Sequence, residues 1–180
     1  MWEAVFRRFW RITILKESPE NIPYSPALMV IVSLLFFLLI ILQWYLADLK
    51  QQFSLATSVM AALTLLCSYF VYTFLLLKIY RKANRALQTL TALLASHMIV
   101  HLFAFPLLVT TPLLVKADLK QIFVLFVGII YLVLTLLLTI WQFVVTVYIY
   151  KRALELDNLP AVLASLGLLA CNILTVSFWQ

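Results

Sequence analysis

Five long stretches without any charged side chain restrict the fold of this chain more than any other feature. They comprise residues 27–47, 53–77, 86–115, 121–150 and 161–179. A helix needs about 20 apolar residues to cross roughly 30 Å of hydrocarbon, and each stretch is about that long or longer. The chain is 66% hydrophobic and 11% charged, so it lacks the polar side chains that cover a soluble surface. The sequence therefore predicts an integral membrane protein.

The composition of these stretches favours helices over strands. A membrane β-barrel would show segments of about ten residues with alternating polarity, whereas these runs are continuous Leu, Val, Ile and Phe. We expect an all-α, polytopic transmembrane helical bundle. The connectors are too short to hold a soluble domain, so residues 27–180 form one five-span membrane domain.

The positive charges predict an orientation, because cytoplasmic loops collect Lys and Arg. With the N-terminus inside, ten of these residues lie on the inner side and three (Lys50, Lys116 and Lys120) lie on the outer side. We therefore expect a cytoplasmic N-terminus and an external C-terminus. The net charge of +6 is explained by topology and contact with anionic lipid headgroups, and no basic patch is large enough to bind nucleic acid.

Two of the five stretches leave questions open. Pro106 and Pro112 interrupt the third, which is either one kinked span or a helix followed by an extended tail. The fourth has 30 residues and reaches about 45 Å as a helix, so we expect it to tilt or to project into water at one end.

Residues 1–16 predict an amphipathic helix in the membrane interface. Aromatic side chains share one face of this helix and arginines share the opposite face, which suits burial in lipid beside anionic headgroups. Docking onto a partner protein is the alternative. The predicted lipid or partner surface consists of Trp2, Phe6, Phe9, Trp10, Arg7, Arg8 and Arg11.

Residues 17–26 contain three prolines and predict a rigid elbow that leads into the first span. Ser25 followed by Pro26 suits the N-cap and first turn of that span. A recognition element for a partner is the alternative interpretation of the elbow.

Small and polar residues form stripes along the second, fourth and fifth spans. Steps of three and four residues place each stripe on one helix face, where it allows close packing and hydrogen bonds between helices. The alternative is a polar path for a solute, although no ionisable side chain besides His accompanies it. The predicted packing seam consists of Thr57, Thr64, Ser68, Thr135, Thr139, Gln142, Thr146 and Asn172.

His97 and His101 lie four residues apart on one face of the third span. This spacing allows two histidines to reach one metal, but no carboxylate lies nearby in the sequence to complete a site. We expect hydrogen-bonded, structural histidines and neither a metal nor a cofactor. Binding of a metal or cofactor, or contact with a quinone or lipid, is the alternative for this pair. Cys67 and Cys171 lie in predicted spans, so we expect no disulfide.

No catalytic motif accompanies these features, and we expect a protein that is not an enzyme. The chain has two glycines, Gly128 and Gly167, which cannot form a phosphate-binding loop. Glu155 and Asp157 lie beside Lys151 and Arg152, and this grouping predicts a solvated charge cluster in a loop.

Two segments resemble the Yip family of five-span membrane proteins, in particular its short proteobacterial relatives. One is the elbow from Glu17 to Pro26, and the other runs from Trp141 to Leu154, ending in Tyr150-Lys151-Arg152-Ala153-Leu154. The resemblance implies a fold without catalytic residues that works through protein partners in a bacterial inner membrane. Eukaryotic members bind small GTPases and carry a longer N-terminal region and an Asp-Leu-Tyr-Gly-Pro-type motif before the first span. This sequence shows neither feature, so we do not expect GTPase binding from the resemblance.

The leading functional prediction is an accessory, assembly or scaffolding subunit of a larger membrane complex. One alternative is a small channel or transporter with a path lined by Thr, Gln and His. A second alternative is a quinone- or cofactor-binding subunit that uses His97 and His101.

Overall fold

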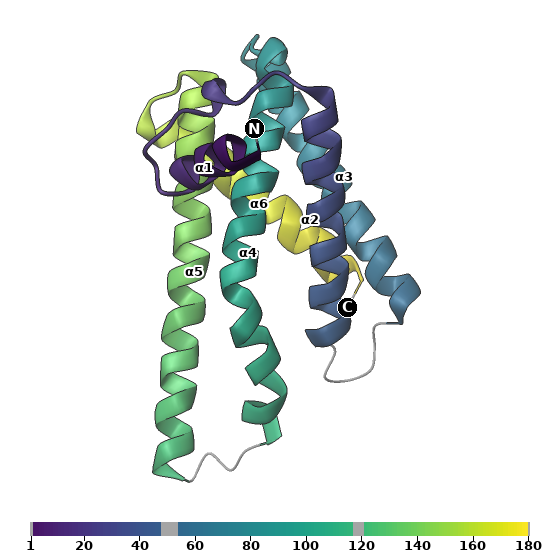
Figure 1. Cartoon of the computed structure of the whole chain (residues 1–180), viewed down its shortest axis with the longest axis vertical. Helices are drawn as coiled ribbons and strands as arrows, with labels where there is room; N and C mark the ends of the chain where they lie inside the picture. The colour runs from purple at the N-terminus through teal and green to yellow at the C-terminus, as the bar shows by residue number, and fades with distance from the viewer. Residues whose placement is uncertain (1, 48–53, 117–120, 180) are drawn as a thin grey trace.

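The computed structural model describes residues 2–47, 54–116 and 121–179 and is all-α in these ranges (Figure 1). Its helices are α1 (Trp2–Thr13), α2 (Pro26–Ala47), α3 (Leu55–Ile79), α4 (Ala86–Lys116), α5 (Ile122–Leu154) and α6 (Asn158–Phe178). Short 3-10 turns occur at Pro19–Asn21 and Ala83–Arg85. Lys50, Lys120 and the side chains of Trp2, Pro112 and Lys116 lie outside the described part of the chain.

The five helices α2 to α6 are long and apolar enough to cross a membrane, as expected of an integral membrane protein. The structure decides between the two alternatives for the third stretch, because α4 is one continuous helix that contains Pro106. The fourth stretch forms a longer helix than expected. α5 continues through Lys151 and Arg152 to Leu154, and only residues 155–157 separate it from α6.

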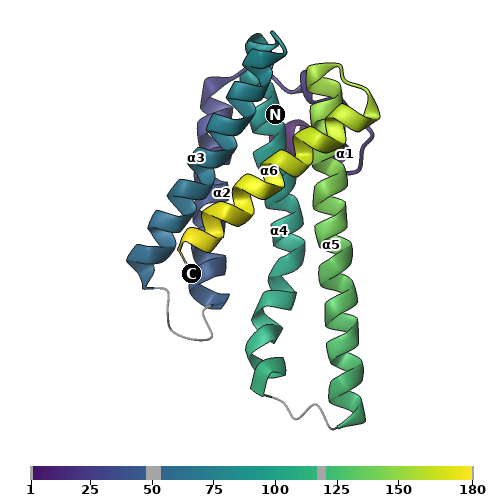
Figure 2. The same cartoon turned by 180° about the vertical axis from the view of Figure 1, so that it is seen from behind.

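Helix α4 lies at the centre of the bundle and contacts α1, α2, α3 and α5. Every side chain from Thr89 to His97 is buried, and several of these residues are Ala, Ser or Thr. Small side chains let neighbouring backbones approach closely, which is how helices pack in an apolar medium. Helix α6 crosses the bundle obliquely and contacts α3 and α5 (Figure 2).

The lower parts of α4 and α5 extend past the ends of α2, α3 and α6 (Figures 1 and 2). We call residues 102–116 of α4 and 122–140 of α5 the arm. The 33 residues of α5 rise about 50 Å, whereas the 22 residues of α2 rise about 33 Å. No side chain from Ile122 to Val144 is buried.

Helix α1 lies across α4 and α5 and uses its apolar face to pack against them. Phe9 and Ile12 belong to the buried core, and the Trp10 ring lies 6.0 Å from Phe103 and 6.5 Å from Trp141. Phe9 was predicted to face lipid or a partner, but the bundle itself covers it. Phe6 is 58% exposed, and the arginines of α1 also remain exposed.

The elbow contains one 3-10 turn, and Ser25 then caps α2 as predicted, since its Oγ accepts a hydrogen bond from the Leu28 N–H at 3.2 Å. Trp141 of α5 binds the C-terminal end of α1, because its Nε1 donates to the Thr13 carbonyl at 2.9 Å. Helix α1 is therefore held against α5 by a hydrogen bond as well as by packing.

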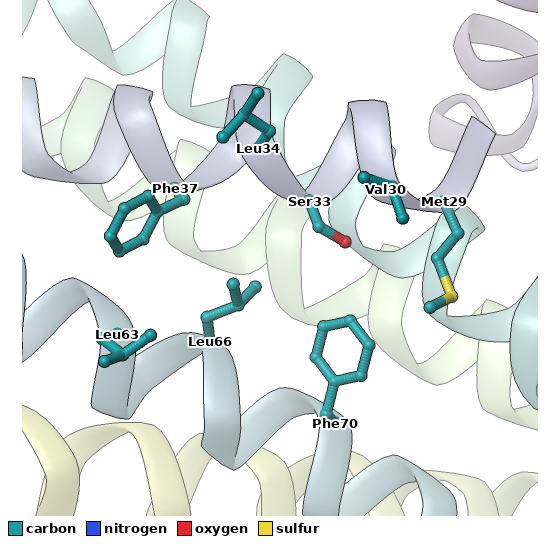
Figure 3. Close-up of a pocket in the computed structure, with 8 residues that line it drawn as sticks. All are labelled: Met29, Val30, Ser33, Leu34, Phe37, Leu63, Leu66 and Phe70. Atoms are coloured by element: carbon teal, nitrogen blue, oxygen red, sulfur yellow. The ribbon is translucent and has the colours of Figure 1, made fainter. Parts of the chain in front are cut away.

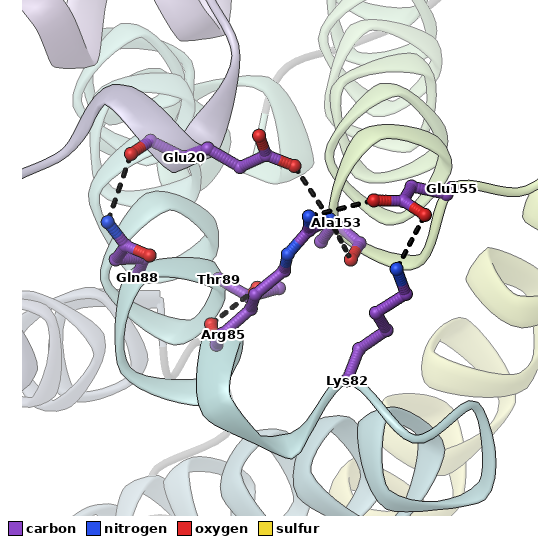
Figure 4. A network of polar contacts seen from close by, with 7 residues as sticks. All are labelled: Glu20, Lys82, Arg85, Gln88, Thr89, Ala153 and Glu155. Carbon is purple, nitrogen blue, oxygen red and sulfur yellow. Dashed lines mark hydrogen bonds and ion pairs between the residues drawn. The ribbon is translucent and has the colours of Figure 1, made fainter.

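Three connectors meet at one end of the bundle in an ion-pair network (Figure 4). Arg85 pairs with Glu20 and with Glu155, each at 2.7 Å, and Lys82 also pairs with Glu155. The hydrogen bond from Lys82 is the largest effect that lowers the pKa of Glu155 below its usual value, followed by that from Arg85. The sequence grouped Glu155 with Lys151 and Arg152, but Lys151 instead donates to the Asn158 side chain. The partners of Glu155 come from a distant connector.

Candidate functional site

A buried polar cluster surrounds His97 on α4, which is 2% exposed. Its Nδ1 lies 2.7 Å from the Tyr69 hydroxyl on α3 and 3.2 Å from Gln142 Nε2 on α5. Its Nε2 lies 2.8 Å from the Thr146 hydroxyl, also on α5. One imidazole thus joins three helices.

The donors and acceptors of this cluster can be assigned from the geometry. An amide nitrogen only donates, so His97 Nδ1 accepts from Gln142 and also from the Tyr69 hydroxyl. His97 Nε2 therefore carries the ring proton and donates to Thr146, whose hydroxyl donates to the Gln142 carbonyl at 2.8 Å. Both nitrogens of this neutral imidazole are engaged, and binding a metal would require breaking these bonds.

His101 has a separate partner on α2. Its Nδ1 donates to Gln43 Oε1 at 2.8 Å, and Gln43 Nε2 donates back to the His101 carbonyl at 2.9 Å. The paired bonds join α2 to α4 next to the ring of Phe36. Gln43 was not predicted as a site residue, although an amide inside the apolar stretch 27–47 was an available signal.

The predicted packing seam divides into connected and exposed residues. Ser68 donates to Asn172 at 3.2 Å and joins α3 to α6. Thr64 accepts from Trp179 Nε1 at 2.9 Å between the same two helices. Thr57 instead lies in the first turn of α3, where its N–H is capped by Ser54. Thr135 and Thr139 are exposed on the arm.

A second buried polar pair was not predicted. The hydroxyls of Thr73 on α3 and Tyr150 on α5 lie 2.9 Å apart, and both side chains are fully buried. Tyrosines near span ends are usually interfacial, so the position of Tyr150 at the end of the stretch 121–150 gave no sign that it is buried.

A groove of about 360 Å³ runs between the two helices of the arm. We call it the arm groove. It is lined by Val100, His101, Ala104, Leu107, Leu108, Thr111, Tyr131, Thr135, Leu138, Thr139 and Gln142. Thr139 and Gln142 also line a smaller cavity of about 90 Å³ that reaches His97, Ser165 and Asn172. The two histidines thus flank adjoining spaces.

Another groove of about 360 Å³ lies between α2 and α3 (Figure 3). Its walls are apolar except for Ser33, whose buried hydroxyl has no hydrogen-bond partner within the described ranges. Figure 3 shows the Ser33 oxygen pointing into the space between the helices. A lipid acyl chain can fill this groove, but one hydroxyl gives little chemistry to recognise a particular ligand.

Residues that could hold a metal do not gather elsewhere in the described part of the chain. No three His, Cys, Asp or Glu side chains there form such a group, and Cys67 and Cys171 are free thiols. No family model, curated protein or solved structure matches this chain. The resemblance to the Yip family therefore stays a prediction.

Proposed function

We propose that this protein is a non-catalytic component of a bacterial inner membrane that serves as an accessory, assembly or scaffolding subunit of a larger membrane complex. The arm is the observation that carries this proposal. Its two helices extend past the rest of the bundle (Figure 1), and most of their described exposed side chains are large and apolar. The resemblance to short proteobacterial Yip relatives supports the choice of membrane.

Helix lengths explain why the arm needs a partner. Helix α2 rises about 33 Å, which is close to one hydrocarbon thickness. When α2 crosses the hydrocarbon, the tip of α5 lies beyond it. Ile122, Phe123 and Phe126 at this tip are 86%, 74% and 60% exposed. Exposed apolar area costs roughly 25 cal/mol per Å², so an apolar surface of another subunit covering this tip would be favoured.

The test is mild extraction in native lipid, followed by quantification of proteins that co-purify at fixed stoichiometry. The amount of partner that co-purifies with the double variant Phe123→Ser/Phe126→Ser should fall by about tenfold or more. Each buried aromatic contributes on the order of 1 kcal/mol or more to an interface. The matched control is Phe74→Ser on α3, where Phe74 is 48% exposed and distant in sequence from the arm. This control should retain the partner.

Two results would overturn the proposal. One is that the wild-type protein is recovered without a stoichiometric partner. The other is a partner that the double variant retains as well as the wild type does, because the arm would then not hold it.

A further inference from the structure

The threonines of the arm groove use their hydroxyl hydrogens inside their own helix. Thr135 donates to the Tyr131 carbonyl at 2.8 Å, and Thr139 donates to the Thr135 carbonyl at 2.9 Å. A hydroxyl whose hydrogen is engaged in this way still has lone pairs that accept hydrogen bonds. These two residues therefore offer acceptors to the groove.

Thr111, Tyr131 and His101 along the groove follow the same rule. Thr111 donates to the Leu107 carbonyl at 3.0 Å, so the Tyr131 hydroxyl donates to Thr111 at 2.8 Å. His101 uses its Nδ1 proton on Gln43, which leaves its Nε2 as an unprotonated acceptor. The groove thus presents several oxygen and nitrogen lone pairs that can accept hydrogen bonds. The hydroxyl and imidazole hydrogens of these residues already donate to other groups of the protein.

The walls of the groove restrict the charge and shape of what it can bind. Among the described residues that line it there is no Asp, Glu, Lys or Arg, so a charged head group would lose its hydration without gaining an ion pair from them. Leu107, Leu108 and Leu138 supply an apolar wall for hydrocarbon. Its volume of about 360 Å³ lies within the usual range of small-molecule sites.

We propose that the arm groove binds an uncharged lipid whose head group is an alcohol or a phenol. The hydroxyl of this lipid donates to the acceptors around His101 and Thr139, and its hydrocarbon lies against the leucines. Ethers, esters and ketones lack a hydrogen to donate to these acceptors. This site is independent of the proposed protein partner.

The experiment uses the purified full-length chain in lipid nanodiscs with a long-chain alcohol that carries a photoreactive diazirine. The matched probe is the methyl ether of the same alcohol, which keeps the tail and the oxygen but has no hydrogen to donate. The alcohol should label peptides covering residues 100–111 and 131–142 about fivefold more than the ether does. A factor of about five in binding corresponds to the net free energy of one hydrogen bond.

Two threonine variants localise the effect. Thr139→Val keeps the side-chain shape but removes an acceptor from the groove, so labelling by the alcohol should fall about fivefold toward the level of the ether. Thr110→Val is the control, because Thr110 is exposed on α4, donates to the Leu107 carbonyl and does not line the groove. Equal labelling by alcohol and ether, labelling outside the groove, or no effect of Thr139→Val would each overturn the proposal.

Discussion

Gly167 shows how one missing methyl group determines the contact between two helices. A Cβ atom at Gly167 on α6 would lie 2.1 Å from the Tyr72 hydroxyl of α3. That hydroxyl donates to the Ala164 carbonyl at 2.7 Å and so ties α3 to the backbone of α6. The close approach depends on glycine for space, since α6 has ordinary helical geometry here.

We therefore predict that Gly167→Ala destabilises the bundle. The added methyl displaces Tyr72 and weakens its bond to Ala164, which should lower the free energy of unfolding by about 1–3 kcal/mol. Gly128→Ala is the matched control, because within the described residues no heavy atom beyond its chain neighbours and the nearby backbone of its own helix lies within 4 Å of a Cβ placed there. It should raise helix stability by up to about 1 kcal/mol. Thermal unfolding in mild detergent measures both changes, and equal melting temperatures for the two variants would contradict the prediction.

Residue spacing predicted where the histidines lie but not what they bind. Their separation of four residues placed His97 and His101 on one face of a helix, and both do lie on α4. Their partners differ because a central helix has neighbours on several sides. His97 reaches Tyr69 on α3, while His101 reaches Gln43 on α2. Periodicity within one helix contains no information about which neighbouring helix faces each side chain.

At the scale of elements, the amphipathic pattern predicted the helix α1 but not what covers it. Lipid tails and a bundle of Leu, Ile and Phe are equally apolar, so the same pattern suits either environment. The structure places Phe9 against the bundle and leaves Phe6 exposed. Phe9 thus lies in the protein interior and Phe6 lies on the surface, a difference that the sequence pattern does not show.

This difference predicts opposite outcomes for two matched substitutions. Phe9→Ala removes a buried side chain and weakens the docking of α1 by about 3 kcal/mol, so amide exchange in α1 should accelerate about a hundredfold. Phe6→Ala removes a side chain that is 58% exposed and should leave exchange in α1 nearly unchanged. Hydrogen exchange with mass spectrometry measures both. Equal acceleration in the two variants would show that α1 is held by lipid rather than by α4 and α5.

The ion-pair network between the connectors predicts a dependence of stability on pH. Lys82 and Arg85 lower the pKa of Glu155 in the folded protein, so the network is fully stabilising above the usual carboxyl range. Its contribution is lost as pH falls through the lowered pKa. The Tm of the wild-type protein should therefore fall below about pH 4.3, the usual pKa of a glutamate.

Two variants test the role of Glu155 in this dependence. Glu155→Gln removes the titrating carboxylate, and Lys82→Met removes the partner that lowers its pKa most. Each variant should have a lower Tm than the wild type at pH 7 and a smaller further decrease in acid. If the Tm of both variants falls in acid as much as the Tm of the wild type, carboxyl groups other than Glu155 cause the pH dependence.

At the scale of the whole molecule, the uncharged stretches predicted how many long helices form but not their relative heights. The length of a stretch gives the length of its helix. The vertical offset between helices depends instead on contacts such as those of His101 with Gln43 and of Thr64 with Trp179. These contacts align α2, α3 and α6 with the upper part of α4 and α5, which leaves the arm extended (Figure 2).

The depth of the arm in a bilayer can be measured with two spin labels on α5. Spin labels at Phe123→Cys and Leu134→Cys, with Cys67 and Cys171 replaced by Ala, would lie about 16 Å apart along α5. Both native side chains are exposed, at 74% and 43%. If α2 spans the hydrocarbon, the label at 123 should lie in water and the label at 134 should lie in lipid. A water-soluble nickel chelate should then increase the spin-relaxation rate of the label at 123, and dissolved oxygen should increase that of the label at 134. If oxygen relaxes both labels, the hydrocarbon covers the whole arm through tilt or local thickening. Lipid alone would then bury the apolar tip, and the need for a covering subunit would disappear.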